Sequence, residues 1–383
     1  MTSTGCAIVG SAETEVGRAL DRTGLDLKLD AATKAIRDAG LTKTQIDGVV
    51  AWQPRREPVP NHSAFVAEQL GIAPRYVADI SLGGAACAST VVSAVAAIRA
   101  GLASTVLCLG GDGKSSVDGK GRRGRLASHR QDFRNPYGGE GAPILYGLMA
   151  RRHMHEYGTT SEQLGAVAVA CRRHASLNPN SQMRQPITIA DHQASPMVVD
   201  PLRRLDCSLI SDGAGAVVVT SAERARDLPH KVVHILGMAT ACRYGDVTYQ
   251  ASMTTSAAVE ASRAAFGAAG ITPEDVDLVE LYDCFTHVVL IQIEDYGFCA
   301  KGESGSFVEG GRIEIGGQLP VNTHGGLLSQ AHVGGMLHIT EGVTQIRGDG
   351  GERQVENARI AVVSGQCGEL GIHVTLVLGS ERT

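Results

Sequence analysis

The chain has 383 residues, of which 43% are hydrophobic and 20% charged, and it carries a net charge of −5 at pH 7. This length and apolar content are enough for two medium domains or one large duplicated one. The negative charge argues against bulk binding of nucleic acid, and no apolar run is long enough to cross a bilayer, so we expect neither nucleic acid nor membrane as a partner.

The first informative segment surrounds Cys87. The run at 76–81 predicts a buried strand, and the apolar spacing at 88–100 predicts a helix. The paired glycines Gly83 and Gly84 between them permit a tight turn. Cys87 therefore falls at or just inside the start of a helix, where the dipole and the unpaired amides favour a thiolate. We predict an acidic, nucleophilic thiol, and a buried structural cysteine among alanines is the alternative.

The cysteines as a set indicate a reducing compartment. They are odd in number, they include no C-x-x-C pair, and no secretory leader precedes them, so we expect free thiols and a cytoplasmic location. The nine are Cys6, Cys87, Cys108, Cys171, Cys207, Cys242, Cys284, Cys299 and Cys367.

A weak internal repeat predicts two halves of like topology. Residues 35–49 match 265–279 at a constant offset of 230, and each copy reads as a helix, a glycine stop, a turn and a strand. A second pair, 96–111 and 345–366, follows the same order. Two matches in one order are hard to obtain by chance, so the chain is predicted to be duplicated.

We place the N-terminal half at 1–228 and the C-terminal half at 229–383. A long excursion at about 112–206 interrupts the first half and predicts a loop domain. Its start is rich in basic residues and glycines, which suits either a phosphate-bearing ligand or a solvated flexible loop. The basic residues that we take as candidate substrate contacts are Arg122, Arg123 and Arg125.

Two segments of the second half place polar residues where strands or loops meet helices. An apolar strand at 276–281 leads into Tyr282, and a helix follows from about residue 285. Further on, His332 lies between the diglycines at 325–326 and 334–335, and a helix near 337–346 follows. Because equivalent turns of two duplicated halves project toward one cleft, Tyr282 and His332 are expected to approach Cys87.

The second segment also supplies candidate substrate contacts around its first diglycine. Asn322 and His324 precede Gly325 and Gly326 in the run "VNTHGG". Polar side chains beside glycine-rich turns suit a binding loop, so we predict these four residues to contact the substrate.

Several motifs together resemble the thiolase superfamily, in the sterol-carrier-protein branch often described as lipid-transfer proteins. The resemblance covers nearly the whole chain. Its motifs are "CAIVG" at the start, "CAST" around Cys87, "PLRRLDCSLISDGAGAVVV" at 201–219, "YDCF" at 282–285, "EDYGFCAKGE" at 294–303 and "LPVNTHGGLLSQAH" at 319–332.

The resemblance implies an α/β thiolase fold: two duplicated halves forming a five-layered αβαβα core with two mixed sheets, plus the loop-domain insert. It also implies an obligate homodimer and an acyl-CoA substrate, with free coenzyme A as a second substrate. No covalently bound cofactor and no metal are expected on this chain.

Carried over by position, Cys87 matches the acylated nucleophile of the family. His332 matches the histidine of the family's G-H-P motif, written here as Ala331-His332-Val333. Tyr282 stands where degradative thiolases have Asn and the sterol-carrier branch has His. The family's second cysteine has no direct counterpart, so either Ser364 or Cys367 is the second acid/base.

These groups imply an acyl-CoA C-acyltransferase that cleaves a 3-oxoacyl-CoA with CoA, or runs the reverse Claisen condensation, through an acyl-cysteine on Cys87. An aromatic or other bulky acyl group is expected. Tyrosine at position 282 also occurs in relatives that act with a small zinc-ribbon and OB-fold accessory protein. We therefore expect such a partner, giving a heterotetramer, with zinc on the partner alone.

Two other functions remain open at this stage. A retro-aldolase would cleave a 3-hydroxyacyl-CoA with a tyrosine acid/base and no covalent thiol; steroid-cleaving relatives usually have tyrosine where this chain has His332. A non-catalytic lipid-binding or scaffold subunit is the other alternative. The retention of Cys87, His332 and Tyr282 favours acyl transfer.

Overall fold

A computed structural model describes residues 4–18, 20–53, 59–113, 141–245 and 247–380. Nine strands form one mixed sheet in the order β3-β2-β4-β7-β1-β8-β11-β10-β9. The first-half strands are β1 (Cys6–Glu13), β2 (Gly48–Trp52), β3 (Tyr76–Ile80), β4 (Thr105–Gly113) and β7 (Asp212–Ser221). The second-half strands are β8 (Val233–Cys242), β9 (Leu278–Glu280), β10 (Ile360–Cys367) and β11 (Ile372–Gly379).

The pairing of these strands repeats itself. In the first half, β2 runs parallel to β4, β4 antiparallel to β7 and β7 antiparallel to β1. In the second, β9 runs parallel to β10, β10 antiparallel to β11 and β11 antiparallel to β8. The two predicted mixed sheets join edge to edge because β1 and β8 pair over Ala7 and Ile8. The repeats read from the sequence lie on equivalent helix and strand pairs.

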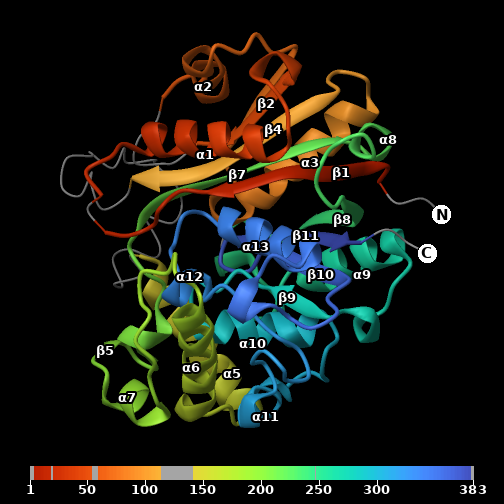
Figure 1. The fold of residues 1–383 in the computed structure, drawn as a ribbon. Helices are drawn as coiled ribbons and strands as arrows, with labels where there is room; N and C mark the ends of the chain where they lie inside the picture. Colours follow the sequence, from red (N-terminus) through yellow and green to blue (C-terminus); the bar gives the residue numbers. More distant parts are fainter. Residues whose placement is uncertain (1–3, 19, 54–58, 114–140, 246, 381–383) are drawn as a thin grey trace.

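Helices lie in layers between the two halves of the sheet and on their outer faces (Figure 1). Two central helices, α3 (Ala86–Arg99) and α13 (Met336–Arg347), contact strands of both halves. The outer face of the first half packs on α1 (Gly24–Asp38), and that of the second on α9 (Ala258–Ala269). Small side chains along α3 suit a helix enclosed on both sides. The five-layered αβαβα prediction is confirmed.

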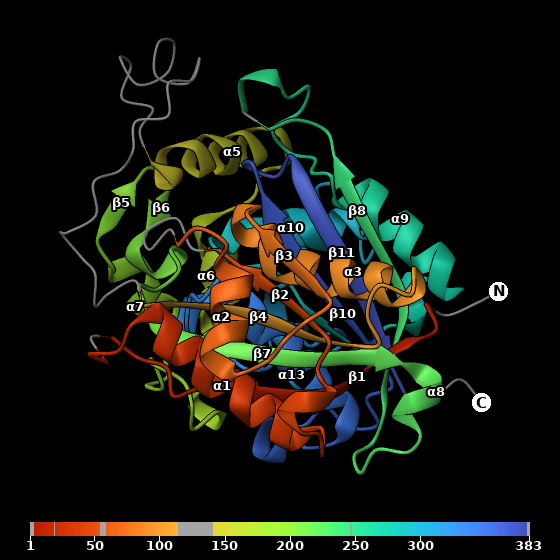
Figure 2. The ribbon, with the colours of Figure 1, turned by 90° about the horizontal axis from the view of Figure 1, so that it is seen from above.

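The described part of the excursion forms a helical group on one side of the molecule (Figure 2). It contains α5 (Ala142–Tyr157), α6 (Ser161–Leu177), α7 (Ile189–Ala194), β5 (Met197–Val199) and β6 (Leu202–Arg203). The candidate contacts Arg122, Arg123 and Arg125 lie outside the described residues. Within those residues, no helix has both the length and the apolar character needed to cross a bilayer.

The remaining described helices are α2 (His62–Leu70), α8 (Ala222–Ala225), α10 (Thr286–Asp295), α11 (Ser304–Phe307) and α12 (Gly326–Ser329). Every residue of α10 and α12 is buried. Buried polar contacts join the helical group to α10: His153 Nε2 lies 3.1 Å from Glu294 Oε1. Asp206 Oδ1 lies 2.9 Å from His192 Nε2 and accepts a hydrogen bond from the Thr286 hydroxyl at 2.6 Å. His174 and His192 are buried residues of α6 and α7, and each ring is held by internal hydrogen bonds.

His287, in the first turn of α10, is expected to make the fold sensitive to acid. Its ring packs on Tyr146 and Phe285, and neither ring nitrogen has a hydrogen-bond partner among the described residues. Burial, with a smaller contribution from His153, lowers the pKa of His287 to about 3. The unfolded chain therefore takes up a proton at higher pH than the folded one, and stability is lost as pH falls from about 6.5 toward 3.

His287→Phe keeps an aromatic ring and removes two buried nitrogens without partners. We expect it to raise the free energy of unfolding by about 1 kcal/mol at pH 7 and to flatten its decline below pH 6.5. Urea unfolding at pH 7 and pH 5 measures both effects. An unchanged difference between the two pH values would contradict this account of His287.

Candidate active site

Cys87 is the second residue of α3, directly after the glycine turn, as the sequence predicts. Its side chain is only 1% exposed, and the amide of Met336, the first residue of α13, donates a hydrogen bond to its thiol. Gly110 of β4 lies behind the sulfur, since a Cβ there would be 2.5 Å from Cys87 Sγ. The nucleophile candidate is thus enclosed by the two central helices and β4.

Tyr282 and His332 meet directly. The Tyr282 hydroxyl lies 3.1 Å from His332 Nε2, and Ser208 Oγ lies 3.1 Å from His332 Nδ1. The two rings are edge to face, with centroids 6.1 Å apart. Both imidazole nitrogens therefore have a hydroxyl partner, and the three groups form a chain along which a proton can move.

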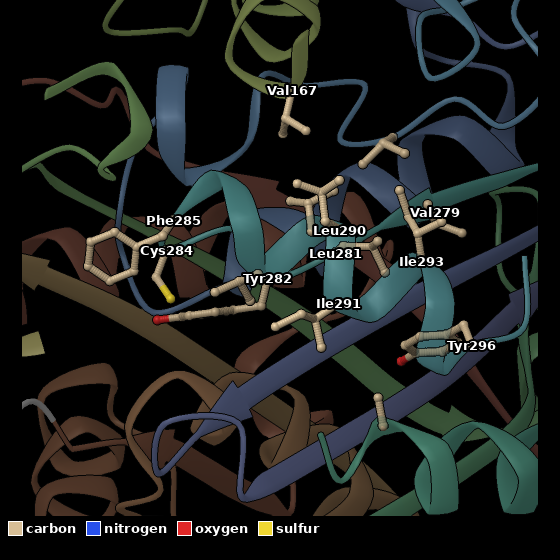
Figure 3. Packing of buried hydrophobic residues seen from close by; sticks show 14 of the residues in the cluster. Val167, Val279, Leu281, Tyr282, Cys284, Phe285, Leu290, Ile291, Ile293 and Tyr296 are labelled. Atoms are coloured by element: carbon tan, nitrogen blue, oxygen red, sulfur yellow. The ribbon is translucent and has the colours of Figure 1, made fainter. Parts of the chain in front are cut away.

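The glycine turn before α3 brings Tyr282 against the nucleophile's helix. A Cβ on Gly84 would lie 2.2 Å from Tyr282 Cζ, and one on Gly335 would lie 3.0 Å from Tyr282 Cδ2. Figure 3 shows Tyr282 beside Cys284 and Phe285, where the chain passes from β9 into α10. Tyr282 therefore lies against the turn before Cys87, and His332 is linked to that turn through the Tyr282 hydroxyl.

The predicted acidity of the Cys87 thiol is wrong. Burial raises its pKa to about 12, and the positive charge of Lys28 and the Met336 amide lower it by less. The helix start is present, but the loss of water around the sulfur outweighs it. Burial, together with the nearby thiols Cys284, Cys87 and Cys367, likewise raises the pKa of Tyr282 well above its usual value. Both groups are therefore neutral hydrogen-bond donors before substrate binds.

Cys367 and Ser364 lie on opposite faces of β10, since alternate residues of a strand point to opposite sides. Cys367 is half-buried beside the glycine turn, because a Cβ on Gly83 would lie 2.5 Å from its sulfur. Ser364 is buried; its hydroxyl accepts from the Tyr282 amide at 2.8 Å and donates to Gln292 Oε1 at 2.6 Å. Ser364 thus supports the Tyr282 backbone, whereas Cys367 faces the turn.

The four candidate substrate contacts in the "NTHGG" segment lie in the interior. Asn322 pairs with the backbone of Leu281 through both ends of its amide, at 2.7 and 2.9 Å. His324 Nδ1 lies 2.7 Å from Glu280 Oε2, and both residues are buried. Burial opposes a charge on His324, yet the Glu280 carboxylate raises the pKa of that imidazole. These polar side chains pair with buried backbone groups and with the Glu280 carboxylate, which is a structural role; their contact with substrate stays a prediction.

Gly325 and Gly326 serve close packing in the same segment. Both have positive φ, at 108° and 65°. A Cβ on Gly325 would lie 2.7 Å from Ala175 Cβ, and one on Gly326 would lie 2.0 Å from Asp283 Oδ2. The diglycine lets the chain turn against α6 and over the Asp283 carboxylate, so its function here is structural.

Comparison with known proteins identifies the family. The model for "Thiolase, N-terminal domain" matches residues 6–223, and that for "Thiolase C-terminal domain-like" matches residues 239–380. The chain belongs to the thiolase family. A steroid side-chain-cleaving aldolase of Thermomonospora curvata is 37% identical over 98% of both chains. An acetyl-CoA acetyltransferase of Methanothermobacter thermautotrophicus is 35% identical over 96% of this chain and 98% of its own.

Two further matches refine the position within the thiolase family. Sterol carrier protein 2 of Bos taurus is 27% identical over 88% of this chain and 65% of its own length, and the predicted branch is confirmed. The solved structure of an "Ltp2-ChsH2(DUF35) aldolase" superposes with a TM-score of 0.90 at 36% identity, covering 99% of this chain and 98% of that one. The chain is an enzyme of the thiolase superfamily.

Three groups of this thiolase site escaped the sequence analysis. Ser208, which hydrogen-bonds to His332, lies in the motif at 201–219, but that motif assigned it no role. Gln292 bridges the Tyr282 carbonyl, at 2.9 Å, and Ser364, and its only signal is a polar residue inside an apolar helix. His338 stacks on Tyr282 with ring centroids 6.2 Å apart. Its signal was a histidine one turn into the helix that follows the His332 loop.

Gly84→Ala tests the close approach of the glycine turn to Tyr282. The new Cβ would also lie 2.5 Å from the Gln366 carbonyl, so the turn and the phenol must both shift. We expect a loss of about 2 kcal/mol of stability together with loss of turnover. Gly267→Ala in α9 is the matched control: nothing lies within 4 Å of its Cβ, and we expect a gain of about 0.5–1 kcal/mol. Thermal unfolding and turnover are measured for both variants. If Gly84→Ala were as stable and as active as Gly267→Ala, the proposed packing would be contradicted.

Proposed function

We propose that this thiolase is an acyl-CoA C-acyltransferase acting on a 3-oxoacyl-CoA with an aromatic or other bulky acyl group. The observation that carries the proposal is the gathering of Cys87, Tyr282, His332 and Cys367 around one glycine turn. It supplies a nucleophile, a proton relay and a second thiol. His332 and Cys367 are half-buried, so substrate would enter from their side.

In the first half-reaction Cys87 Sγ attacks the β-carbonyl carbon, and its proton passes to His332. The high pKa of the free thiol means that this transfer has to accompany attack. The bond between the α and β carbons then breaks, leaving an acyl-Cys87 and the enolate of a shorter acyl-CoA. The Tyr282 hydroxyl donates to the enolate oxygen, a bond that strengthens as the charge develops.

In the second half-reaction the acyl group leaves the enzyme. Cys367 gives its proton to the α carbon of the enolate, and the product thioester departs. Coenzyme A then binds as a substrate, and its thiol proton returns to Cys367 as its sulfur attacks the acyl-Cys87 carbonyl. Every group ends in its starting protonation state once His332 returns its proton to the departing Cys87 sulfur. The same steps reversed are a Claisen condensation.

Retro-aldol cleavage of a 3-hydroxyacyl-CoA is the second candidate. Two observations favour it. Tyr282 contacts His332 directly, and the raised pKa of Cys87 keeps its thiol protonated and therefore a poor nucleophile. There the relay takes the β-hydroxyl proton, the same carbon–carbon bond breaks, and a carbonyl compound leaves with the enolate protonated afterwards. The Thermomonospora curvata relative is a steroid side-chain-cleaving aldolase, which supports this alternative.

We also propose two assembly partners and a cytoplasmic location. The first partner is a second copy of the chain, because β3 is an edge strand whose Val77 is 44% exposed. The second is a zinc-ribbon and OB-fold accessory protein that carries the zinc, giving a heterotetramer. The similar Ltp2 aldolase structure is named together with a second component, ChsH2(DUF35), which supports a partner of this kind. We also propose that the two halves of the chain meet at 228/229. CoA is proposed to bind to Arg122, Arg123 and Arg125.

The decisive experiment offers both substrate types to the enzyme, alone and co-expressed with an accessory protein encoded beside it. Release of two CoA thioesters from a 3-oxoacyl-CoA plus CoA supports acyl transfer. Release of a carbonyl compound from the 3-hydroxyacyl-CoA, with no CoA consumed, supports the aldolase. Light scattering on the same samples gives the mass of the assembly, and a monomer under all conditions would overturn both proposed partners.

A further inference from the structure

His338 lies in the first turn of α13, outside every step of the mechanism above. It is completely buried, although an imidazole is seldom placed in a core without a reason. Its Nε2 donates to Asp283 Oδ1 at 3.0 Å, and its Nδ1 has no hydrogen-bond partner among the described residues. The hydrogen bond to Asp283 therefore holds the His338 ring in place.

Asp283 is itself held rigidly. The two carboxylate oxygens of Asp283 accept the amides of Leu327 and Leu328 in α12, at 2.8 and 3.3 Å. Gly326 allows this contact, since a Cβ there would lie 2.0 Å from Asp283 Oδ2. Asp283 directly follows Tyr282 in the chain, so His338 is tied to the backbone that carries the phenol.

The anchored imidazole is stacked on Tyr282. The two ring planes differ by 25°, with centroids 6.2 Å apart, whereas His332 meets the same phenol edge-on at 81°. On the turn side, the backbones of Gly84 and Gly335 pack closely against the phenol ring, since a Cβ on them would lie 2.2 and 3.0 Å from Tyr282 atoms. His338 supplies the aromatic ring that stacks on Tyr282, and His332 supplies the hydrogen-bond partner of its hydroxyl.

We infer that His338, held by Asp283, is a positioning residue that keeps the Tyr282 hydroxyl aimed at His332 Nε2 and at the reacting oxygen of the substrate. The inference rests on the proposed function, since it concerns the use made of Tyr282 in carbon–carbon cleavage. It predicts that the ring of His338 matters more than its charge or its polarity.

Three variants separate the ring from the hydrogen bond. His338→Phe keeps a flat ring, His338→Gln keeps a donor toward Asp283, and His338→Ala keeps neither. Because misplacing a catalytic group by a fraction of an ångström costs rate more than binding, we expect kcat to fall roughly tenfold or more in the Ala and Gln variants, with KM within about threefold. The Phe variant should stay within about threefold of wild type.

A double-variant cycle with Tyr282→Phe makes the dependence on Tyr282 explicit. If His338 acts through the Tyr282 hydroxyl, His338→Ala costs no more than about twofold once that hydroxyl is gone. The inference would be overturned if the loss of kcat in His338→Ala multiplied with the loss in Tyr282→Phe. It would also be overturned if His338→Phe folded and had a kcat as low as that of His338→Ala. Thermal unfolding of each variant identifies losses that come from unfolding alone.

A readout without turnover keeps this test independent of the proposed function. The protein is labelled with 3-fluorotyrosine, and the Tyr282 resonance is assigned from its absence in Tyr282→Phe. We expect that fluorine signal to move or broaden in His338→Ala and to stay near its position in His338→Phe. A signal unmoved in both variants overturns the inference. If the wild type turns over neither substrate type, the proposed function fails, and the fluorine spectrum still decides the position of Tyr282.

Discussion

Replacing Cys87 by alanine is expected to lower kcat for thiolysis of a 3-oxoacyl-CoA by about 10⁴-fold or more, because the acyl group then has no acceptor on the enzyme. The loss should appear in kcat, since Cys87 is buried at the end of the site and contributes little to binding the CoA portion. Steady-state rates measured with both thioester products separated by chromatography give the effect.

Cys108→Ala is the matched control for Cys87. Cys108 of β4 is also buried, and burial likewise raises the pKa of its thiol to about 12. Its sulfur lies 3.4 Å from the Thr90 carbonyl, and the neighbouring Cys87 thiol makes a small contribution to raising its pKa. We expect a loss of stability with kcat nearly unchanged. If Cys87→Ala behaves like Cys108→Ala, the enzyme does not use a covalent thiol and the retro-aldol alternative stands.

Tyr282→Phe should give the second large effect. The ring and its stacking on His338 remain, while the hydroxyl that meets His332 Nε2 is lost. Removing one donor to a developing enolate costs on the order of 10²–10³ in kcat. His332→Ala should cost a similar factor, and the double variant little more, because the two groups act as one relay.

Tyr296→Phe controls for the loss of a buried tyrosine hydroxyl. The hydroxyl of Tyr296, at the end of α10, lies 2.9 Å from His373 Nε2 and 2.7 Å from Thr375 Oγ1 on β11. Tyr296 is well separated from Tyr282 (Figure 3). We expect lower thermal stability and unchanged kcat. Equal losses of kcat for Tyr282→Phe and Tyr296→Phe would mean that the Tyr282 effect is one of folding.

Much of the site follows from the sequence because the fold repeats. The glycine turn before α3 and the diglycine before α13 precede equivalent helices of the two halves, so the approach of the His332 loop to the Cys87 turn could be predicted from the repeat. The strand ends and helix starts at Tyr282 and Met336 follow from hydrophobic spacing in the same way.

Other features of the site depend on burial in the folded protein, which a local sequence pattern does not predict. The helix start at Cys87 predicts a lowered thiol pKa, yet enclosure by α13 and β4 reverses the direction. Asn322 and His324 have the residue types of a binding loop, but their side chains satisfy the Leu281 backbone and the Glu280 carboxylate. A polar residue in a glycine-rich segment serves equally well to close a buried hydrogen-bond network.

The choice between Ser364 and Cys367 shows a further limit. Strand alternation predicts that the two residues point to opposite sides of β10, but not which side faces the nucleophile. Packing decides it: Gly365 and Cys367 face the turn before α3, and Ser364 faces the Tyr282 backbone.

The intact mass of the protein after brief incubation with a 3-oxoacyl-CoA, in the absence of free CoA, tests the central claim most directly. The account predicts one added acyl group, mapped by peptide sequencing to Cys87, removed when CoA is supplied and absent in Cys87→Ala. Turnover of substrate by the wild-type enzyme with no added mass at any time, and the same rate in Cys87→Ala, would contradict it.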